Sequence, residues 1–274
     1  MLARICGNSR RPRTYKCATL RGRYPGYAPV DARQRAVPGF DSSKFSESVI
    51  TEIGCGGLNG ESGEGFARKG PRELQLFDGD KVEPPNLNRQ FFSAADIGKN
   101  KAICLAKNLS RQGFLGTVIT GYPYYFQEWL ESHQLPPTDL LVCGVDDDET
   151  RIFVSRYALN HNLPVIFSAV SRDGNQGYVF VQEQGKACFG CAFPGALKGR
   201  ESPCPNTPAI KDILKVVAGV VLYAADTIIC DRKRNWNYRM IYLAGYMPDV
   251  NQQIDRRPDC PLCGESEEKV CGLA

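Results

Sequence analysis

The chain contains 274 residues, 42% of them hydrophobic and 23% charged, which suffices for one large α/β domain or two small ones. It has neither an apolar run long enough to span a bilayer nor the apolar core of a signal peptide, which argues against a membrane protein and against secretion, so we expect a cytoplasmic location. The formal net charge is +4, but the chain beyond residue 29 is slightly acidic, which argues against nucleic-acid binding.

The N-terminal segment differs in composition from the rest of the chain. Its 29 residues carry seven basic side chains and no acidic one, and proline and glycine interrupt them. Such a composition is typical of a disordered tail. We therefore divide the chain into a disordered tail, residues 1–29, and one folded domain, residues 30–274. The simplest interpretation of the tail is an unstructured extension, and an organelle-targeting peptide is the alternative.

The folded part alternates short apolar strands with helices that have one apolar face. This alternation predicts a mainly parallel sheet with helices on both faces, which is a Rossmann-like α/β fold. The predicted strands, in chain order, are residues 48–53, 73–77, 117–121, 139–145, 164–170, 177–181 and 238–243. The predicted helices are residues 61–69, 99–112, 126–132, 150–161 and 209–229.

A glycine-rich turn, Gly54-Cys55-Gly56-Gly57, follows the first predicted strand. A turn of this kind lets the backbone approach phosphates closely, and the helix after it supplies free N–H groups and the positive end of its dipole. Asp78 ends the second predicted strand, where an acid can bind a ribose hydroxyl. By itself this pattern fits NAD-dependent dehydrogenases as well as enzymes that use ATP.

The motifs that follow favour ATP. Residues 78–90 read DGDKVEPPNLNRQ, residues 96–101 read DIGKNK, and the pair Asp146-Asp147 stands shortly ahead of Arg151. Together these motifs, spread over about residues 33–263, resemble the ThiF/MoeB/HesA family of the ubiquitin-activating enzyme superfamily. The resemblance implies a homodimer that uses ATP and Mg²⁺ to adenylate the C-terminal carboxylate of a ubiquitin-like or sulfur-carrier protein.

The resemblance also implies roles for the matched residues. The glycines would line the phosphates, Asp78 would hold the ribose, Arg89 and Lys101 would reach phosphate, and Asp146 would hold magnesium. Positive groups suit this chemistry because negative charge builds up when a carboxylate attacks the α-phosphate. The implied nucleotide-binding residues are Gly54, Gly56, Gly57, Asp78, Asn86, Arg89, Gln90, Lys101, Asp146 and Asp147.

Three further positions bear on this interpretation. Asp147 stands where the family usually has Asn, and Asn59 stands where it commonly has Gly. Asn tolerates positive φ better than most residues, so we expect the turn to be kept. Upstream, the pair Arg33-Gln34 resembles a family segment whose arginine reaches the ATP of the other subunit. Arg33 is therefore a candidate arginine finger acting in trans, and a plain surface arginine is the alternative.

Two Cys-x-x-Cys pairs, Cys188/Cys191 and Cys260/Cys263, have the spacing of tetrahedral zinc ligands. All four ligands would come from the protein, so we expect Zn²⁺ to serve a structural role and to hold the C-terminal segment against the body. A redox pair or free thiols are the alternatives.

Cys204 lies in the loop of residues 192–208, between the first cysteine pair and the long predicted helix. The superfamily places its thioester cysteine in this interval, and a thiol near a helix N-terminus is a better nucleophile. We expect Cys204 to attack the acyl-adenylate and to pass the resulting thioester to a conjugating enzyme. An incidental loop cysteine is the alternative.

Three other functions remain open from the sequence. A sulfur-carrier adenylyltransferase of the thiamin or molybdopterin type would need adenylation alone, without an obligatory thioester. A non-catalytic adaptor would keep the fold and bind a carrier protein without using ATP. An NAD-linked oxidoreductase would use the glycine turn but leaves the NLNRQ segment without a role.

Overall fold

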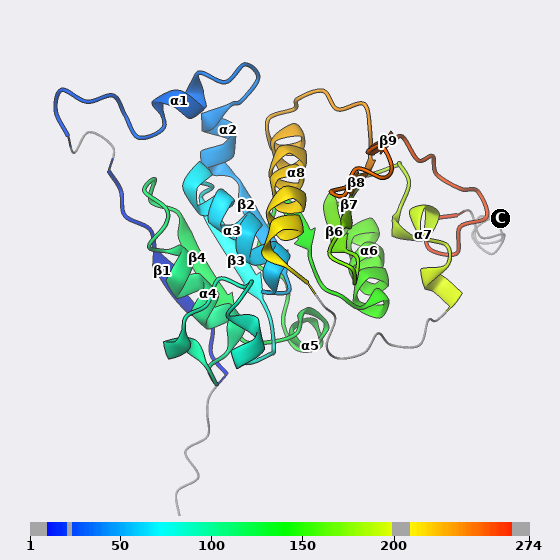
Figure 1. Ribbon diagram of the computed structural model, residues 1–274, viewed down its shortest axis with the longest axis horizontal. Helices are drawn as coiled ribbons and strands as arrows, with labels where there is room; N and C mark the ends of the chain where they lie inside the picture. The colour runs from blue at the N-terminus through cyan, green and yellow to red at the C-terminus, as the bar shows by residue number, and fades with distance from the viewer. Residues whose placement is uncertain (1–9, 21–23, 199–208, 265–274) are drawn as a thin grey trace, which may run out of the picture.

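The computed structural model describes residues 10–20, 24–198 and 209–264 (Figure 1). These residues contain one nine-stranded sheet with the order β1-β4-β3-β2-β5-β6-β7-β8-β9. Strands β4, β3, β2, β5 and β6 are parallel to one another, and β1, β7, β8 and β9 are antiparallel to their neighbours. The strands are β1 Arg13–Lys16, β2 Val49–Ile53, β3 Glu73–Phe77, β4 Val118–Tyr122, β5 Leu140–Cys143, β6 Val165–Val170, β7 Gln176–Gln182, β8 Tyr238–Tyr242 and β9 Val250–Gln252.

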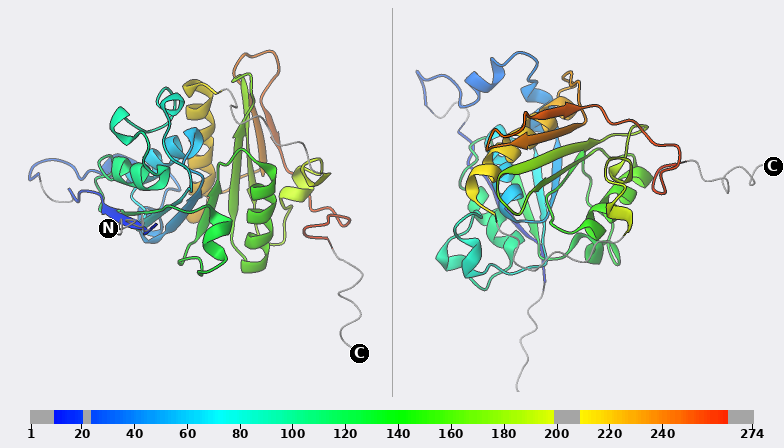
Figure 2. Two further views of the ribbon diagram at one scale, coloured as in Figure 1. Left: turned by 90° about the horizontal axis from the view of Figure 1, so that it is seen from below. Right: turned by 45° about the vertical axis from the view of Figure 1, so that its right-hand side comes forward.

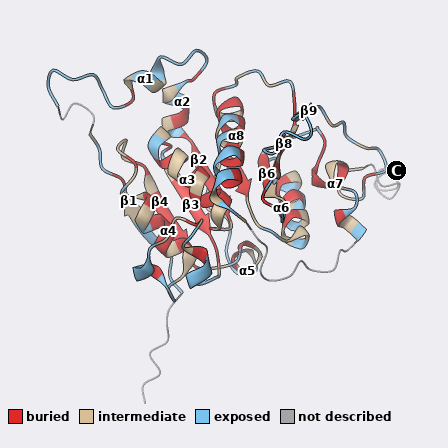
Figure 3. Cartoon of the chain, viewed as in Figure 1, coloured by how far each residue is buried: buried red, intermediate tan, exposed pale blue. Residues whose placement is uncertain are grey.

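Helices cover both faces of this sheet, which confirms the predicted Rossmann-like architecture (Figure 2). One face packs against α3, α4 and α8, and the other packs against α5, α6 and α7. The central strands are buried on both sides, as Figure 3 shows. The helices are α1 Ala32–Arg35, α2 Ser42–Glu47, α3 Gly57–Lys69, α4 Lys101–Leu109, α5 Phe126–Leu130, α6 Asp148–His161, α7 Phe189–Ala192 and α8 Lys211–Ile229, with 3-10 turns η1 Pro84–Asn86, η2 Ala94–Asp96 and η3 Ala196–Lys198.

The N-terminal segment corrects one expectation. We predicted a disordered tail over residues 1–29, but Arg13–Lys16 form β1, which pairs with the free edge of β4. Cys17 then continues this pairing, because its N–H donates to the carbonyl of Thr117 and its side chain is buried. Pairing with an open sheet edge satisfies backbone groups in a segment whose own side chains cannot form a core.

The glycines of α3 allow α8 to approach closely. The helix begins at Gly57, four residues earlier than predicted, with Gly56 as its N-cap. A Cβ atom added at Gly57 would lie 2.5 Å from the Leu214 side chain, and one added at Gly65 would lie 2.3 Å from Leu222. These glycines lower the helix propensity of α3, but they allow α3 and α8 to pack in close contact.

Glu52 is a buried acid in the central strand β2. Its side chain is fully buried, and the Ser62 hydroxyl of α3 donates a hydrogen bond of 2.6 Å to its Oε1. Burial raises the pKa of Glu52 from 4.5 to about 8, against the smaller effect of the Ser62 hydrogen bond. The folded protein therefore holds this carboxyl protonated at neutral pH.

We predict that Glu52→Gln flattens the dependence of stability on pH. The unfolded chain releases the Glu52 proton near pH 4.5 and the folded protein releases it near pH 8. The contribution of Glu52 to the free energy of unfolding is therefore complete below about pH 4.5 and is lost as the pH rises towards 8. Urea unfolding from about pH 5 to 8 should show a decline of about 1 kcal/mol per pH unit that the variant lacks. Glu47→Gln, at the exposed end of α2, is the matched control.

Candidate functional site

The predicted nucleotide residues gather at one edge of the sheet. Strand β2 pairs with β3 on one side and with β5 on the other, so the strand order reverses there. Ligands of open α/β sheets bind outside the carboxyl ends of the strands at such a reversal. The glycine turn follows β2, Asp78 follows β3, and Asp146 follows β5.

The glycine turn leaves open space ahead of α3. Gly54 has φ of 86°, and a Cβ atom there would lie 3.0 Å from the Val145 side chain. A Cβ atom at Gly56 would meet no atom of the described chain within 4 Å. No described side chain caps the first turn of α3, so its N–H groups and positive dipole end face this space. The arrangement suits an anionic group such as a phosphate.

Asn59 supports this turn from inside the fold. Its buried amide donates hydrogen bonds to the carbonyls of Ile53 and Gly54, at 3.0 and 2.8 Å. Gly144, at the end of β5, makes room for it, since a Cβ atom there would lie 2.3 Å from Asn59 Oδ1. Asn59 therefore braces the turn from below and leaves its other side open.

Asp78 binds the turn as well. Its Oδ2 accepts from the Cys55 N–H at 2.7 Å and its Oδ1 accepts from the Asp80 N–H at 2.8 Å. Only 7% of the residue is exposed, and burial raises the pKa of Asp78 although Lys101 opposes this effect. Each carboxylate oxygen can accept a second hydrogen bond. The predicted ribose contact is compatible with this geometry and stays a prediction.

Lys101, at the start of α4, lies near the carboxylates of Asp78 and Asp80. Its Nζ is 2.9 Å from Asp80 Oδ2, and the Tyr125 hydroxyl donates to Asp80 Oδ1 at 2.5 Å. Burial lowers the pKa of Lys101, but the charges of Asp78 and Asp80 outweigh it and leave this pKa above its usual value. Our sequence reasoning missed Asp80 and Tyr125. The repeated acid in Asp78-Gly79-Asp80 was a usable signal for the first of these, and nothing local marked the second.

The NLNRQ segment forms a tight, partly buried turn. Asn86 Oδ1 accepts from the Glu83 N–H at 2.9 Å and so caps η1. The Arg89 guanidinium donates to the Pro85 carbonyl at 2.7 Å. Gln90 is buried, and its Oε1 makes no hydrogen bond to the part of the chain that the structure describes. The structure thus holds these residues in place, and their contacts with a nucleotide stay predictions.

The two aspartates after β5 have different surroundings. Asp147 is the N-cap of α6, and its Oδ1 accepts from the Thr150 N–H at 2.6 Å. Asp and Asn are equally good N-caps, so the Asn expected here from the resemblance would serve the same structural role. Asp146 is exposed at the sheet edge, as a magnesium ligand would need to be. The Arg151 guanidinium donates to the Val145 carbonyl at 2.7 Å and fixes the loop that carries both aspartates.

Arg33 lies far from the glycine turn of its own chain. The neighbouring Gln34 side chain donates to the carbonyl of Lys69, the last residue of α3, at 3.0 Å. Gly57 stands at the other end of this helix, about 18 Å away at 1.5 Å per residue. Figure 1 shows α1 beyond one end of the central strands and α5 beyond the other. An exposed Arg33 can therefore serve a phosphate site only in a second subunit, which stays a prediction.

The four predicted metal-ligating cysteines meet in one cluster. Their sulfur atoms all lie within 4.8 Å of one another, and the Cys188–Cys260 and Cys191–Cys263 pairs are 3.5 and 3.4 Å apart. Ligands about 2.3 Å from a tetrahedral zinc ion would lie about 3.8 Å apart, so the cluster fits a metal ion with little adjustment. The Arg257 N–H also donates to Cys191 Sγ at 3.3 Å, a contact typical of thiolate ligands.

The two cysteines nearest the glycine turn and the end of β5 are poor candidates for the nucleophile. Cys55 and Cys143 are fully buried, and burial raises the pKa of Cys143 to about 12 and that of Cys55 well above its usual value. The predicted thioester cysteine, Cys204, lies outside the described residues, so its place relative to the glycine turn stays a prediction.

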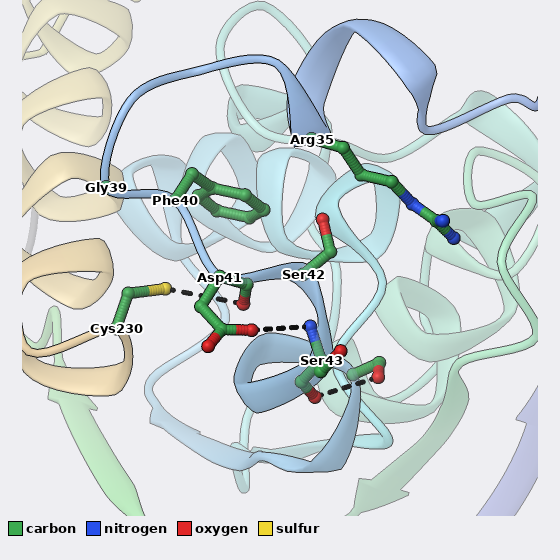
Figure 4. A pocket seen from close by; sticks show the side chains of 8 residues that line it. Arg35, Gly39, Phe40, Asp41, Ser42, Ser43 and Cys230 are labelled. Carbon is green, nitrogen blue, oxygen red and sulfur yellow. Dashed lines mark hydrogen bonds between the residues drawn. The ribbon is translucent and has the colours of Figure 1, made fainter.

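A separate pocket of about 560 Å³ lies between α2 and the end of α8 (Figure 4). It is lined by Arg35, Asp41, three serines of α2 and Cys230. Since α2 precedes β2 and α8 ends at this pocket, it lies at the end of the strands opposite the glycine turn. None of the predicted site residues that the structure describes lines it. Separately, none of the helices in the described ranges is both long and apolar enough to cross a membrane.

Comparison with known families and relatives agrees with this geometry. Residues 32–262 match the model of the ThiF family. The ATP-dependent ubiquitin transferase-like protein Cap2 of Escherichia coli (strain TW11681) is 26% identical over 252 residues, which cover 82% of this chain and 42% of Cap2. Ubiquitin-like modifier-activating enzyme 5 of Drosophila willistoni is 28% identical over 180 residues, 61% of this chain and 44% of that enzyme. The chain thus spans less than half the length of these relatives.

Solved structures share the fold. A crystal structure of E. coli MccB with MccA-N7isoASN superposes with a TM-score of 0.75 and 22% identity, covering 89% of this chain and 77% of that one. A second MccB structure, with ATP, gives a TM-score of 0.68 and 21% identity over 81% of this chain and 68% of that one.

We predict that the cysteine cluster binds one equivalent of a divalent metal and that Cys260→Ser removes it. Elemental analysis of the purified chain would measure the metal. Loss of the metal should lower Tm by roughly 5–10 °C, since it releases the segment that carries Cys260 and Cys263. Cys230→Ser is the matched control, as Cys230 is buried outside the cluster, and it should keep the metal. A wild-type chain that has the same Tm with and without its metal would contradict the prediction.

Proposed function

The chain belongs to the ThiF family, and from this membership and the geometry of the β2–β5 edge we propose that it adenylates the C-terminal carboxylate of a ubiquitin-like or sulfur-carrier protein. The observation that carries the proposal is the open N-terminus of α3 together with the Lys101 ammonium, whose charge acts on Cys55 in the glycine turn and on Asp78, at the point where the strand order reverses. The two sources of positive charge suit a polyphosphate, and the exposed Asp146 lies on the next loop.

The proposed reaction needs charge stabilisation more than proton transfer. A carboxylate oxygen of the carrier attacks the α-phosphorus of ATP, the bond to pyrophosphate breaks, and an acyl-adenylate forms. Negative charge then grows on the α-phosphate and on the departing pyrophosphate. The first turn of α3, Lys101 and Arg89 would stabilise this charge. A magnesium ion held by Asp146 would add charge neutralisation and Lewis-acid polarisation of the phosphates.

The relatives support this proposal without deciding the substrate. One is called an ATP-dependent ubiquitin transferase-like protein and another a ubiquitin-like modifier-activating enzyme, and MccB has been crystallised with ATP. We propose zinc as the metal of the cysteine cluster, because four thiolates in a closed, buried tetrahedron are typical of structural zinc. A homodimer in which Arg33 reaches the partner's nucleotide completes the proposal.

The second proposed step is transfer of the acyl group to Cys204. The Cys204 thiolate attacks the acyl-adenylate, AMP leaves, and the thioester would then pass to a conjugating enzyme. The buried state of Cys55 and Cys143 supports this choice, since neither thiol is available as an alternative nucleophile. Without this step the enzyme would serve sulfur transfer, in which a sulfur donor attacks the adenylate directly.

We predict that Lys101→Ala lowers the rate of ATP–pyrophosphate exchange about 100-fold, the usual effect of removing one group that stabilises transition-state charge. Exchange would be measured with ubiquitin-like proteins from the same source. Lys99→Ala is the matched control, because Lys99 is exposed and its ammonium contacts only a backbone carbonyl among the described residues. Absence of exchange with every candidate would contradict the proposed function and favour a carrier-binding adaptor.

We also predict that Cys204→Ala keeps wild-type exchange and loses the reducible adduct with the carrier. Exchange reports adenylation, which precedes the thiol step, and a non-reducing gel reports the thioester. An adduct that persists in Cys204→Ala would rule out this cysteine, and exchange without any adduct in the wild type would favour sulfur transfer.

A further inference from the structure

Tyr125 is an exposed aromatic residue beside the proposed nucleotide site. It is the N-cap of α5 and is 54% exposed, and its hydroxyl donates to Asp80, which is paired with Lys101. We propose that Tyr125 is a positioning residue that acts through Asp80 to hold the Lys101 ammonium ready for phosphate. The inference rests on the proposed function, since it assigns a role within the same site.

The backbone around Asp80 is already fixed. Its carbonyl accepts from the Lys101 N–H at 2.8 Å and from the Asn100 side-chain amide at 3.1 Å. Its own N–H donates to Asp78. The Asp80 side chain, in contrast, is 47% exposed, so it needs a further contact to stay in one rotamer. The Tyr125 hydroxyl supplies that contact on Oδ1 and leaves Oδ2 for Lys101.

The contact between Tyr125 and Asp80 depends on Gly79. A Cβ atom at Gly79 would lie 2.8 Å from ring carbons of Tyr125, so only glycine allows the ring to rest on this turn. The sequence Asp78-Gly79-Asp80 therefore provides one aspartate for the glycine turn, a gap for the aromatic ring, and a second aspartate for the lysine.

The charges of these groups support a positioning role. The Lys101 ammonium has three donors, and within the described part of the chain it gives one of them to Asp80, which leaves two for a ligand. Burial tends to raise the pKa of Asp80, but the hydrogen bonds from Tyr125 and Lys101 outweigh it and keep the carboxyl ionised. The hydrogen bond to Asp80 raises the pKa of Tyr125 to about 12, so the phenol remains a donor at neutral pH. This donation offsets charge on Asp80 that would otherwise repel an incoming phosphate.

The test compares ligand affinities of the full chain and its variants by calorimetry. Tyr125→Phe should weaken binding of Mg·ATP and of inorganic tripolyphosphate by the same factor, roughly 3- to 10-fold, the effect of losing a hydrogen bond to a charged group one step from the ligand. Adenosine affinity should not change. Tyr124→Phe is the matched control, because the Tyr124 hydroxyl donates to the Arg10 carbonyl and does not contact Asp80 among the described residues.

A double-mutant cycle separates positioning from a general structural effect. If Tyr125 acts through Lys101, Tyr125→Phe should cause no further loss of affinity in a Lys101→Ala background. It should likewise add nothing to Asp80→Asn. Independent, additive losses, or a loss of adenosine affinity in Tyr125→Phe, would overturn the inference. Unchanged Mg·ATP affinity in Tyr125→Phe would also overturn it.

The outcome for the wild type separates the two proposals. A wild-type chain that binds Mg·ATP and loses affinity in Lys101→Ala but not in Tyr125→Phe refutes the positioning role and leaves the proposed function standing. A wild-type chain that binds neither Mg·ATP nor tripolyphosphate refutes both.

Discussion

The hydrogen bonds of Asp78 are the constraint on which the candidate site depends. A glycine turn is flexible, and it can present N–H groups to a phosphate only if the backbone is held in one conformation. Asp78 holds the turn from β3 through the Cys55 N–H, and Asn59 holds it from α3 through the carbonyls of Ile53 and Gly54. Both side chains are buried, so solvent does not compete strongly for these bonds. The open face of the turn is thereby left to a ligand.

The same carboxylates connect this turn to α4 and α5. Asp78 accepts from the Asp80 N–H, and Asp80 in turn binds Lys101 and Tyr125. Elements from three separate parts of the chain therefore share one polar network at the carboxyl edge of the sheet. Polar groups in such a network restrict one another, which is how a site on loops acquires a defined geometry.

The cysteine cluster has an analogous role on the other side of the sheet. It joins Cys188 and Cys191, next to α7, to Cys260 and Cys263 near the end of the described chain. Along the chain, the antiparallel strand β7 comes just before the first cysteine pair, and β8 and β9 lie between the two pairs. Strand β9 is only three residues long. A metal at the cluster would stabilise this thin edge, where few side chains are buried.

The sequence by itself determined strands β2 to β8, the five longer helices between them, the glycine turn and the four-cysteine cluster, because hydrophobic periodicity and short motifs are local properties of the chain. Only the tertiary structure decided that Arg13–Lys16 form an edge strand and that Asp80 and Tyr125 belong to the site. Tyr125 and Asp80 are 45 residues apart, and β1 and β4 are over 100 apart. Contacts across such separations leave no pattern in a single sequence, because they depend on which loops the parallel sheet brings to the same edge.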